Sequence, residues 1–272
     1  YGDRTMTGIV KTDQIQGAQG TTVTVPTGNT LAVTDNATVG GTLGVTGNST
    51  VGGTVGIGAS NNSSYDANAR NVLIADESGN SGLTIRSGGG SSYGMIHFAD
   101  GVSSADEYRA GRIVYEHSSN SMQFSTANTQ SLVINGTGAI TMPLQPSFQG
   151  GVTSALSSAG TIKAGYTYHN QGNHYNSSTG LFTAPITGKY LCGLVVMSNG
   201  NVTIDVGLTI NGSVSHMFVP YQNNTGSTHN QVSGICIAAV SANDTLGFNL
   251  NSGSVYAGTN GRHSSITFHL LA

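Results

Sequence analysis

The sequence predicts an all-β protein, namely an elongated, intertwined homotrimeric β fibre with a repeat shaft, a small β stem domain and a C-terminal jelly roll. Three observations predict this architecture. Charged residues form 8% of the 272 residues, against roughly 25% in ordinary globular chains, and 40 glycines with abundant Ser, Thr and Asn replace them. Short apolar-alternating units repeat over residues 30–58. Strand-like alternation with no helical period fills the C-terminal part.

The composition also excludes several classes of protein. The net charge of −3 provides no basic field for nucleic acid or an anionic membrane. No hydrophobic run approaches the length of a membrane span, so we expect no membrane insertion. Disordered chains are usually charged and poor in Val, Ile and Leu, whereas this chain has few charges and keeps these residues. We therefore expect a folded β protein whose solubility comes from hydroxyl and amide groups.

Residues 1–29 are expected to be an N-terminal attachment segment. The stretch GIVKTDQIQGAQGTTVTVPTGNTL, residues 8–31, resembles the opening of many phage tail-fibre and virion proteins, which have VKTDxIQ-like and VxVPxGxTL-like strands. The resemblance covers about twenty residues. It implies that the N-terminus contacts other virion proteins of a tail or baseplate.

Residues 30–60 are predicted to form the repeat β shaft. A twelve-residue unit is written almost twice and then begun again, in TLAVTDNATVGG, TLGVTGNSTVGG and TVGIG. Apolar residues such as Val33, Val45 and Val55 alternate with small ones, which is the period of a strand. One such ribbon cannot bury enough apolar surface to offset its chain entropy, whereas three intertwined copies cover one another's edges. The alternative of a flexible linker is disfavoured because linkers do not keep Val and Leu in register.

Residues 61–146 are predicted to form the stem, a small β domain of several hairpins that is also trimeric. Short strand-like runs follow one another, in NVLIAD, GLTIRS, YGMIHFAD, GRIVYEH, SMQFST, SLVING and GAITMP. The elements from Gly94 to Phe98 and from Gly111 to Phe124 resemble a module that recurs in phage tail fibres and tailspikes. The resemblance implies a structural module and not a catalytic one.

Residues 147–272 are predicted to form the head. Pro143 and Pro146 in MPLQPSF mark the boundary, because proline interrupts regular strand pairing. In VTIDVGLTING the apolar residues from Val202 to Ile210 alternate with Thr203, Asp205, Gly207 and Thr209, and Asn211-Gly212 supplies a hairpin turn. About eight to ten such strands are typical of an antiparallel sandwich or jelly roll.

The head resembles the C1q-like jelly-roll family, which includes the complement head and tumour necrosis factor. The stretch YNSSTGLFTAPITGKYLC carries the pattern, and SANDTLGF and SSITFHLLA carry later parts of it. The matching residues, to which the resemblance assigns a structural role, include Tyr175, Gly180, Phe182, Pro185, Gly188, Tyr190 and Asp244. The resemblance implies a ten-strand jelly roll, a compact homotrimer and use as a recognition head. Some relatives hold calcium through clustered acids, which we do not expect here because the head has only Asp205 and Asp244.

The sequence offers little chemistry beyond binding, so we expect no enzyme, no cofactor and no metal. His169 and His174 could provide two metal ligands, but no acid or cysteine stands nearby to complete a site. Asp100, Asp106 and Glu107 form an acidic cluster, which we interpret as solvated loop charges and not as the paired carboxylates of a glycosidase. Cys192 and Cys236 are interpreted as buried thiols, with a disulfide between neighbouring strands as the alternative.

Recognition is expected in the polar, aromatic-bearing loops of the head, since loops on a rigid β scaffold normally carry binding residues. The loops YQNNTGSTHNQ and SGSVYAGTNGRHSS supply the candidate receptor-binding residues, which are Tyr221, Asn223, Asn224, His229, Tyr256, Asn260 and Arg262. The resulting hypothesis is a phage fibre, located in the virion and at the extracellular surface, whose head adheres to a host glycan or protein. The alternatives are a purely structural virion or extracellular fibre whose head drives trimerisation, and a polysaccharide depolymerase.

Overall fold

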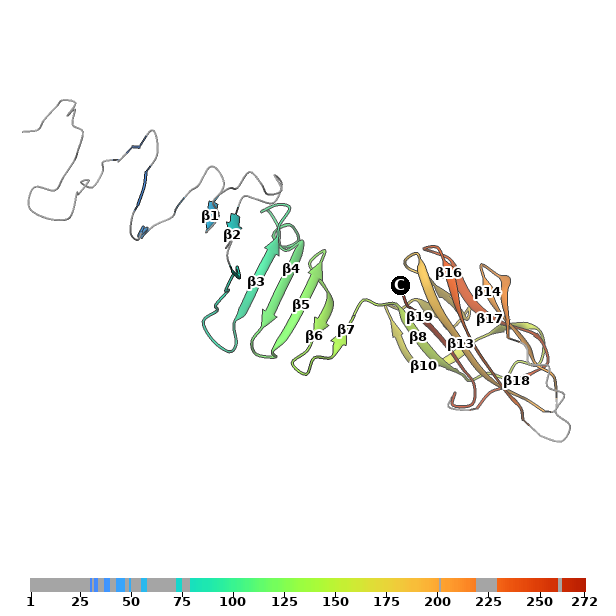
Figure 1. The fold of residues 1–272 in the computed structure, drawn as a ribbon. Coiled ribbons are helices and arrows are strands. Elements are labelled where there is room, and N and C mark those ends of the chain that lie inside the picture. Colours follow the sequence, from blue (N-terminus) through green and yellow to red (C-terminus); the bar gives the residue numbers. More distant parts are fainter. Residues whose placement is uncertain are drawn as a thin grey trace, which may run out of the picture. The chain divides into compact units, whose positions relative to one another are not determined.

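The computed structural model describes residues 79–200, 202–218, 229–258 and 261–272, with short pieces between residues 30 and 74 (Figure 1). The chain divides into two compact units, Tyr1–Leu83 and Thr84–Ala272. The expected attachment segment, residues 1–29, lies outside the described residues.

In the first unit, strand β1 (Val55–Ile57) pairs in parallel with β2 (Val72–Ile74), with Val55 opposite Val72. The described apolar side chains of the expected shaft are exposed in a single chain, including Val33, Leu43 and Val45. An exposed apolar side chain gains no stabilisation from burial unless another surface covers it. The intertwined trimeric shaft therefore stays a prediction that these exposed side chains favour.

The segment expected to be the stem contains one antiparallel sheet of five strands in sequential order, here called the stem sheet (Figure 1). Its strands are β3 (Tyr93–Phe98), β4 (Gly111–Glu116), β5 (Ser121–Thr126), β6 (Thr129–Ile134) and β7 (Ile140–Thr141). The run GLTIRS, residues 82–87, forms no strand, contrary to expectation. The acidic loop contains a one-turn helix, α1 (Ala105–Tyr108), which begins because the Ser104 side chain accepts a hydrogen bond from the Glu107 N–H.

The two faces of the stem sheet differ in character because side chains alternate along each strand. One face carries a cross-strand row in which Ile96, Ile113, Phe124 and Leu132 are successive partners. We call this the apolar stem face. The opposite face carries His97 beside Arg112, and Tyr93 beside Glu116. We call this the polar stem face.

The second part of the Thr84–Ala272 unit is a jelly roll of two antiparallel sheets (Figure 1). The β13 sheet has the order β10-β8-β19-β13-β16, with β18 on β13. Its strands are β8 (Ser147–Val152), β10 (Ala164–Gln171), β13 (Gly188–Ser198), β16 (Gln231–Val240), β18 (Val255–Tyr256) and β19 (Ser265–Leu270). The β17 sheet has the order β11-β12-β17-β14-β15, with β9 on β17. Its strands are β9 (Gly160–Ile162), β11 (Tyr175–Asn176), β12 (Leu181–Thr183), β14 (Asp205–Ile210), β15 (Ser213–Phe218) and β17 (Thr245–Ser252).

The predicted hairpin between β14 and β15 is confirmed. Asn211 and Gly212 have φ values of 52° and 79°, as the tight hairpin turn that suits the twist of antiparallel strands requires. The expected division of β14 into a core face and a solvent face is only partly correct. Thr209 on the expected solvent face is buried and donates a hydrogen bond to the Gly247 carbonyl, and Val214 and Met217 pack close to Gly207.

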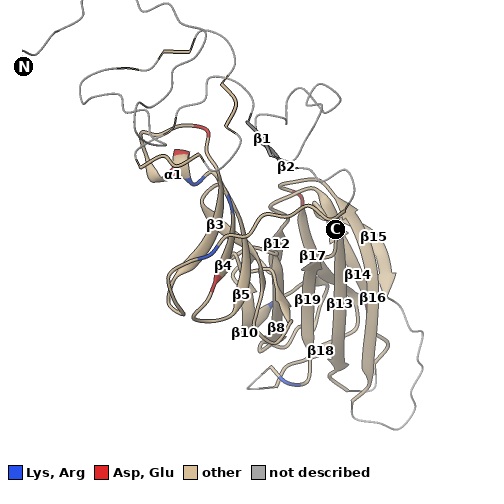
Figure 2. Ribbon diagram, turned by 60° about the vertical axis from the view of Figure 1, so that its left-hand side comes forward, with Lys and Arg blue, Asp and Glu red and all other residues tan. Residues whose placement is uncertain are grey.

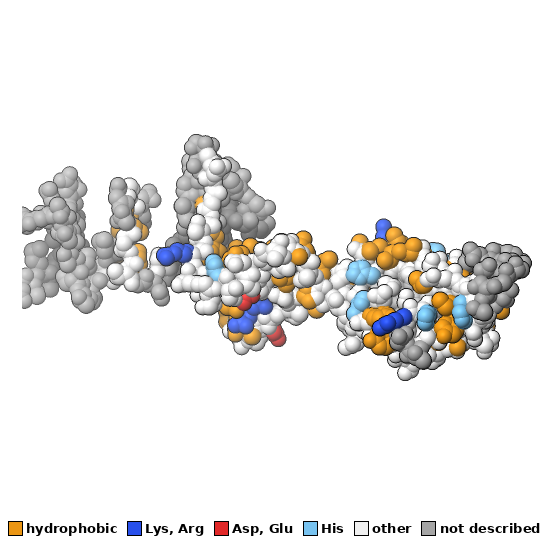
Figure 3. All heavy atoms as spheres, turned by 90° about the horizontal axis from the view of Figure 1, so that it is seen from below, with side chains coloured by type: hydrophobic (Ala, Val, Ile, Leu, Met, Phe, Trp, Pro, Cys, Tyr) orange, Lys and Arg blue, Asp and Glu red, His pale blue; other side chains and the backbone are white. Residues whose placement is uncertain are grey.

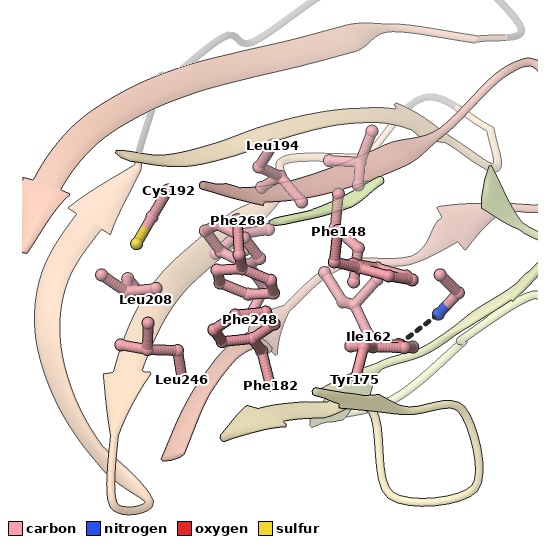
Figure 4. Close-up of a cluster of buried hydrophobic side chains, with 14 of the residues drawn as sticks. Phe148, Ile162, Tyr175, Phe182, Cys192, Leu194, Leu208, Leu246, Phe248 and Phe268 are labelled. Atoms are coloured by element: carbon pink, nitrogen blue, oxygen red, sulfur yellow. Dashed lines mark hydrogen bonds between the residues drawn. The ribbon is translucent and has the colours of Figure 1, made fainter. Parts of the chain in front are cut away.

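Aromatic side chains from both sheets fill the jelly-roll core (Figure 4). Phe268 of the β13 sheet stacks between Phe182 and Phe248 of the β17 sheet, with ring centroids 5.3 and 5.4 Å apart. Phe148 stacks on Tyr175 at 3.7 Å, and the Tyr175 hydroxyl accepts a hydrogen bond from the Ala164 N–H at 2.7 Å. The core thus ties the two sheets together by stacking, and the hydroxyl of the buried Tyr175 has a hydrogen-bond partner.

The remaining residues of the C1q-like sequence pattern lie at turns and in the core. Gly180 has a φ of 80°, which favours glycine. A side chain on Gly188 would collide with the Ala272 carbonyl, and the buried Tyr190 donates its hydroxyl to the Ile186 carbonyl at 2.9 Å. Pro185 lies in the loop between β12 and β13 and is half-buried, and the Asp244 carboxylate accepts hydrogen bonds from the Ser241 N–H and the Asn211 amide at 2.8 Å.

The two cysteines lie on neighbouring strands of the β13 sheet. Cys192 and Cys236 are direct cross-strand partners, and both are free thiols. Burial raises the pKa of both thiols. The interpretation of Cys192 as a buried thiol agrees with the structure, since its side chain belongs to the hydrophobic core.

Candidate functional site

Three of the candidate receptor-binding residues lie in the described part of the head. His229 precedes β16, Tyr256 ends β18, and Arg262 lies in the loop before β19. The other four candidates, Tyr221, Asn223, Asn224 and Asn260, lie outside the described residues.

A row of three rings brings two of these candidates together with a third residue. The ring centroids of His229 and Tyr256 are 4.7 Å apart, and those of Tyr256 and His263 are 5.6 Å apart. We call these three residues the ring cluster. His229, Arg262 and His263 are exposed, while Tyr256 is half-buried. Figure 3 shows histidine, basic and hydrophobic side chains side by side on one surface of the head.

Two buried serines, Ser198 and Ser264, position the ring cluster through hydrogen bonds to the segments that carry the rings. The Ser198 hydroxyl accepts a hydrogen bond from the Asn230 N–H at 2.7 Å, and the Ser198 carbonyl lies 2.9 Å from Nδ1 of His229. The Ser264 hydroxyl donates to the Tyr256 carbonyl at 3.1 Å and accepts from the Met197 N–H at 3.0 Å. These hydrogen bonds join the segment before β16 and the loop 252–265 to the end of β13, so that a long strand of the sheet fixes the positions of the rings.

A glycine makes room for the third ring. A side chain on Gly258 would collide with the imidazole of His263. On the other side of the loop, the Tyr168 hydroxyl donates to the Gly261 carbonyl at 3.4 Å, and the rings of Tyr166 and Tyr168 meet edge to face at 5.1 Å. Sequence reasoning missed His263 and both tyrosines. The adjacent His-Ser-Ser of the candidate loop and the alternation in AGYTYHN were the signals that could have found them.

The ring cluster is suited to binding a polar, ring-shaped ligand without net charge. Aromatic faces stack on apolar surfaces, and the imidazole nitrogens of the cluster and the guanidinium of the adjacent Arg262 can form hydrogen bonds. Charged residues are sparse along the ribbon of the jelly roll and concentrated around α1, β3 and β4 (Figure 2). Among the residues that the structure describes, no three His, Cys, Asp or Glu side chains gather as a metal site would require.

The two histidines weighed as metal ligands have different surroundings. His169 lies in β10, and the ring of His174 packs edge to face near Phe182 at 6.0 Å. Partial burial lowers the pKa of His174. This packing gives His174 a structural role.

The acidic cluster of the stem also has structural partners. Asp106 accepts a hydrogen bond from the Asn128 amide at 2.9 Å, and Glu107 accepts one from the Ser103 N–H at 2.8 Å. Both carboxylates therefore order the loop around α1, in agreement with their interpretation as loop charges.

None of the helices in the described part of the chain has the length and apolar character that a membrane span needs.

Comparison with known proteins assigns the head. The family model of the C1q domain matches residues 147–271. The globular domain of the zebrafish complement 1qA protein is similar at 16% identity and a TM-score of 0.38, over 47% of this chain and 98% of that chain. Murine APRIL is similar at 10% identity and a TM-score of 0.39, over 47% and 99%. An Eiger TNF from S. frugiperda is similar at 16% identity and a TM-score of 0.38, over 47% and 93%.

C1q domains are generally binding and structural domains without enzymatic activity, and they typically form homotrimers. They are also typically extracellular or secreted. The all-β jelly roll expected from the sequence is confirmed. Residues 147–271 of this chain are a C1q domain.

Proposed function

We propose that this chain forms a homotrimeric fibre of the phage tail-fibre type and that its C1q head adheres to a glycan or protein of the host surface. The N-terminus would attach the fibre to tail or baseplate proteins, in line with the resemblance of residues 8–31. Three features of the structure support the proposal, and the first carries it.

The outward face of the β13 sheet carries an apolar patch on β16 and β13, beside polar residues such as Gln149 and Thr267. Ile235 and Ile237 of β16 are 67% and 55% exposed. Gly193 of β13 lies opposite Ile235 of β16 and opposite Thr267 of β19. Because Gly193 has no side chain, a hollow of about 440 Å³ opens beside Leu191 and Ile235. An exposed apolar ridge next to a hollow lined by both apolar and polar residues is the kind of surface that another copy of the chain would cover.

The apolar stem face supports the same assembly. A single sheet with one uncovered apolar face lacks the second layer that a stable domain needs. Phe98, Phe124 and Ile140 are exposed on it. Three copies around a threefold axis would supply the missing layers to one another.

The ring cluster supports adhesion, because it gathers two exposed imidazoles and a half-buried phenol ring at the loops of the head. We expect Tyr256→Ala and His263→Ala to weaken the binding of the labelled full chain to bacterial cells, or to arrayed neutral glycans, by at least tenfold. Val102→Ala, at a stem residue that is 89% exposed and lies outside both proposed binding sites, serves as the control and should bind as the wild type does. Sedimentation must show that the variants stay trimeric.

The alternative function is a purely structural fibre, which the apolar patch of the β13 sheet favours because it accounts for trimerisation without a ligand. Trimers that bind no cell and no glycan would favour this alternative. A protein that sediments as a folded single copy would refute both functions.

A further inference from the structure

The polar stem face contains a hollow of about 390 Å³. Its floor is the buried Val114, whose cross-strand partners are Met95 on one side and Gln123 on the other. Its walls are formed by six side chains, which are Tyr93, Met95, His97, Arg109, Arg112 and Gln123. Figure 3 shows basic, acidic and hydrophobic side chains lying together on the surface of the stem sheet.

Two guanidinium groups line this hollow. Arg109 and Arg112 form no salt bridge with any acid in the described part of the chain; Arg109 instead stands over the Tyr108 ring at 5.3 Å. Arg112 donates from Nη2 to Ser125 Oγ at 3.5 Å, which is long for a hydrogen bond. Its Nε is buried and has no acceptor among the described residues. A buried donor of a charged group without an acceptor is unfavourable, so an acceptor from a ligand would stabilise this site.

The acid on the same face is already engaged by neutral donors. Glu116 accepts hydrogen bonds from Tyr93, Ser118, Ser119 and Gln123, at 3.3, 3.1, 2.9 and 2.8 Å. The hydrogen bonds of Ser119 and Ser118 lower the pKa of Glu116 most. Its carboxylate is therefore bound to hydroxyl and amide groups and leaves both arginines to an external anion.

We propose that the polar stem face binds the carboxylate of an acidic saccharide, such as a uronic acid residue, through Arg109 and Arg112. The planar guanidinium fork matches the two oxygens of a carboxylate. Tyr93 and Met95, which are 49% and 46% exposed, offer apolar surface for the ring that carries the carboxylate. His97 supplies a further exposed ring at the same wall. The site is separate from the ring cluster, and it needs no trimer, although the proposed trimer leaves this face outward.

The test titrates the full chain with trigalacturonic acid by isothermal calorimetry. We expect saturable binding that Arg109→Gln weakens at least tenfold and that Arg112→Lys weakens as well, because lysine keeps the charge but not the fork. Arg86→Gln removes the same charge from the stem outside the hollow and should bind as the wild type does. The neutral trisaccharide galactotriose should bind at least tenfold more weakly.

Absence of saturable binding to trigalacturonic acid would overturn the proposal, and so would an equal loss in Arg86→Gln. Inorganic phosphate that binds as tightly as the trisaccharide acid would reduce the site to a general anion site and overturn the saccharide assignment. Sedimentation and the cell-binding assay with Tyr256→Ala are run on the same preparations. A failure of the stem site is thereby distinguishable from a failure of the proposed fibre function.

Discussion

Replacing Ile235 by serine tests the proposal that the β13 sheet faces another copy of the chain. Complete burial of an isoleucine side chain stabilises by about 1.5–3 kcal/mol. About two thirds of Ile235 is exposed, so its burial in a trimer would contribute about 1–2 kcal/mol per copy and about 3–6 kcal/mol for three copies. This corresponds to an association constant lowered by about two to four orders of magnitude. The midpoint concentration for trimer formation then rises by about one to two orders of magnitude, because it varies as the square root of a trimer dissociation constant.

The assay is sedimentation equilibrium over a dilution series, with near-ultraviolet circular dichroism to verify that each subunit stays folded. Ile186→Ser is the matched control, because Ile186 is 50% exposed but lies in the loop between β12 and β13. We expect Ile186→Ser to leave the midpoint unchanged. The reasoning is refuted if both substitutions shift the midpoint equally, or if Ile235→Ser leaves it where the wild type has it.

Three further predictions concern the head. Phe268→Ala should lower the free energy of unfolding by about 3–5 kcal/mol, measured by urea denaturation at fixed protein concentration, because Phe268 is fully buried between two rings; a loss below 1 kcal/mol would contradict the stacking argument. Cys192 should resist alkylation by iodoacetamide at pH 8 until urea unfolds the chain, because burial raises the pKa of its thiol; rapid labelling in the native state, read by mass spectrometry, would contradict its burial. Hydrogen bonds from Asn211 and Ser241 hold the pKa of Asp244 below its ordinary value of 3.8. The contribution of Asp244 to the free energy of unfolding is therefore present above that value and is lost as the pH falls through the lower pKa of the folded state. Asp244→Asn should flatten this acid limb of the curve of stability against pH, and an unchanged limb would show that the carboxylate does not contribute.

Strand periodicity predicted most of the head because most of its long strands, such as β13 and β17, have one face in the core. Leu246, Phe248 and Leu250 of β17 are all fully buried, as alternation predicts. The same rule failed at 82–87, where GLTIRS alternates but forms no strand. Alternation gives a strand only where a neighbouring edge is available for pairing, and that edge is a property of tertiary structure.

Local capping chemistry, in contrast, was readable and was overlooked. Ser104 followed three residues later by Glu107 is the pattern that begins a helix, and α1 begins there. The helix has only one turn, which is too short to show a helical repeat of apolar residues in the sequence. The helix also bears on the proposed stem site, because Arg109 directly follows α1 and lines the hollow.

The composition of the ring cluster could be predicted only in part, because its members come from two loops that are distant in the chain. The loop 252–265 was identified from its polar and aromatic residues, but the sequence does not show that His229 packs against Tyr256 at 4.7 Å. That contact depends on hydrogen bonds from Ser198 to the segment before β16, which lies 31 residues further along the chain at His229. Pairings at such separation are set by sheet topology and not by local pattern.

One physical property connects the fibre hypothesis with both candidate binding sites. In the stem sheet, apolar residues collect on one face and arginines on the other. In the head, the outward face of the β13 sheet carries an apolar patch at Ile235 and Ile237, and the rings collect at the loops. If copies of the chain cover the apolar faces, the surfaces that remain in contact with solvent are the polar stem face and the ring cluster. Assembly would then expose both sites three times on one particle, and threefold presentation raises the avidity for a repetitive glycan without any new contact. Weak binding by a single site is therefore compatible with firm adhesion by the fibre, and a monomeric Ile235→Ser chain should keep the affinity of each site while losing the avidity for cells.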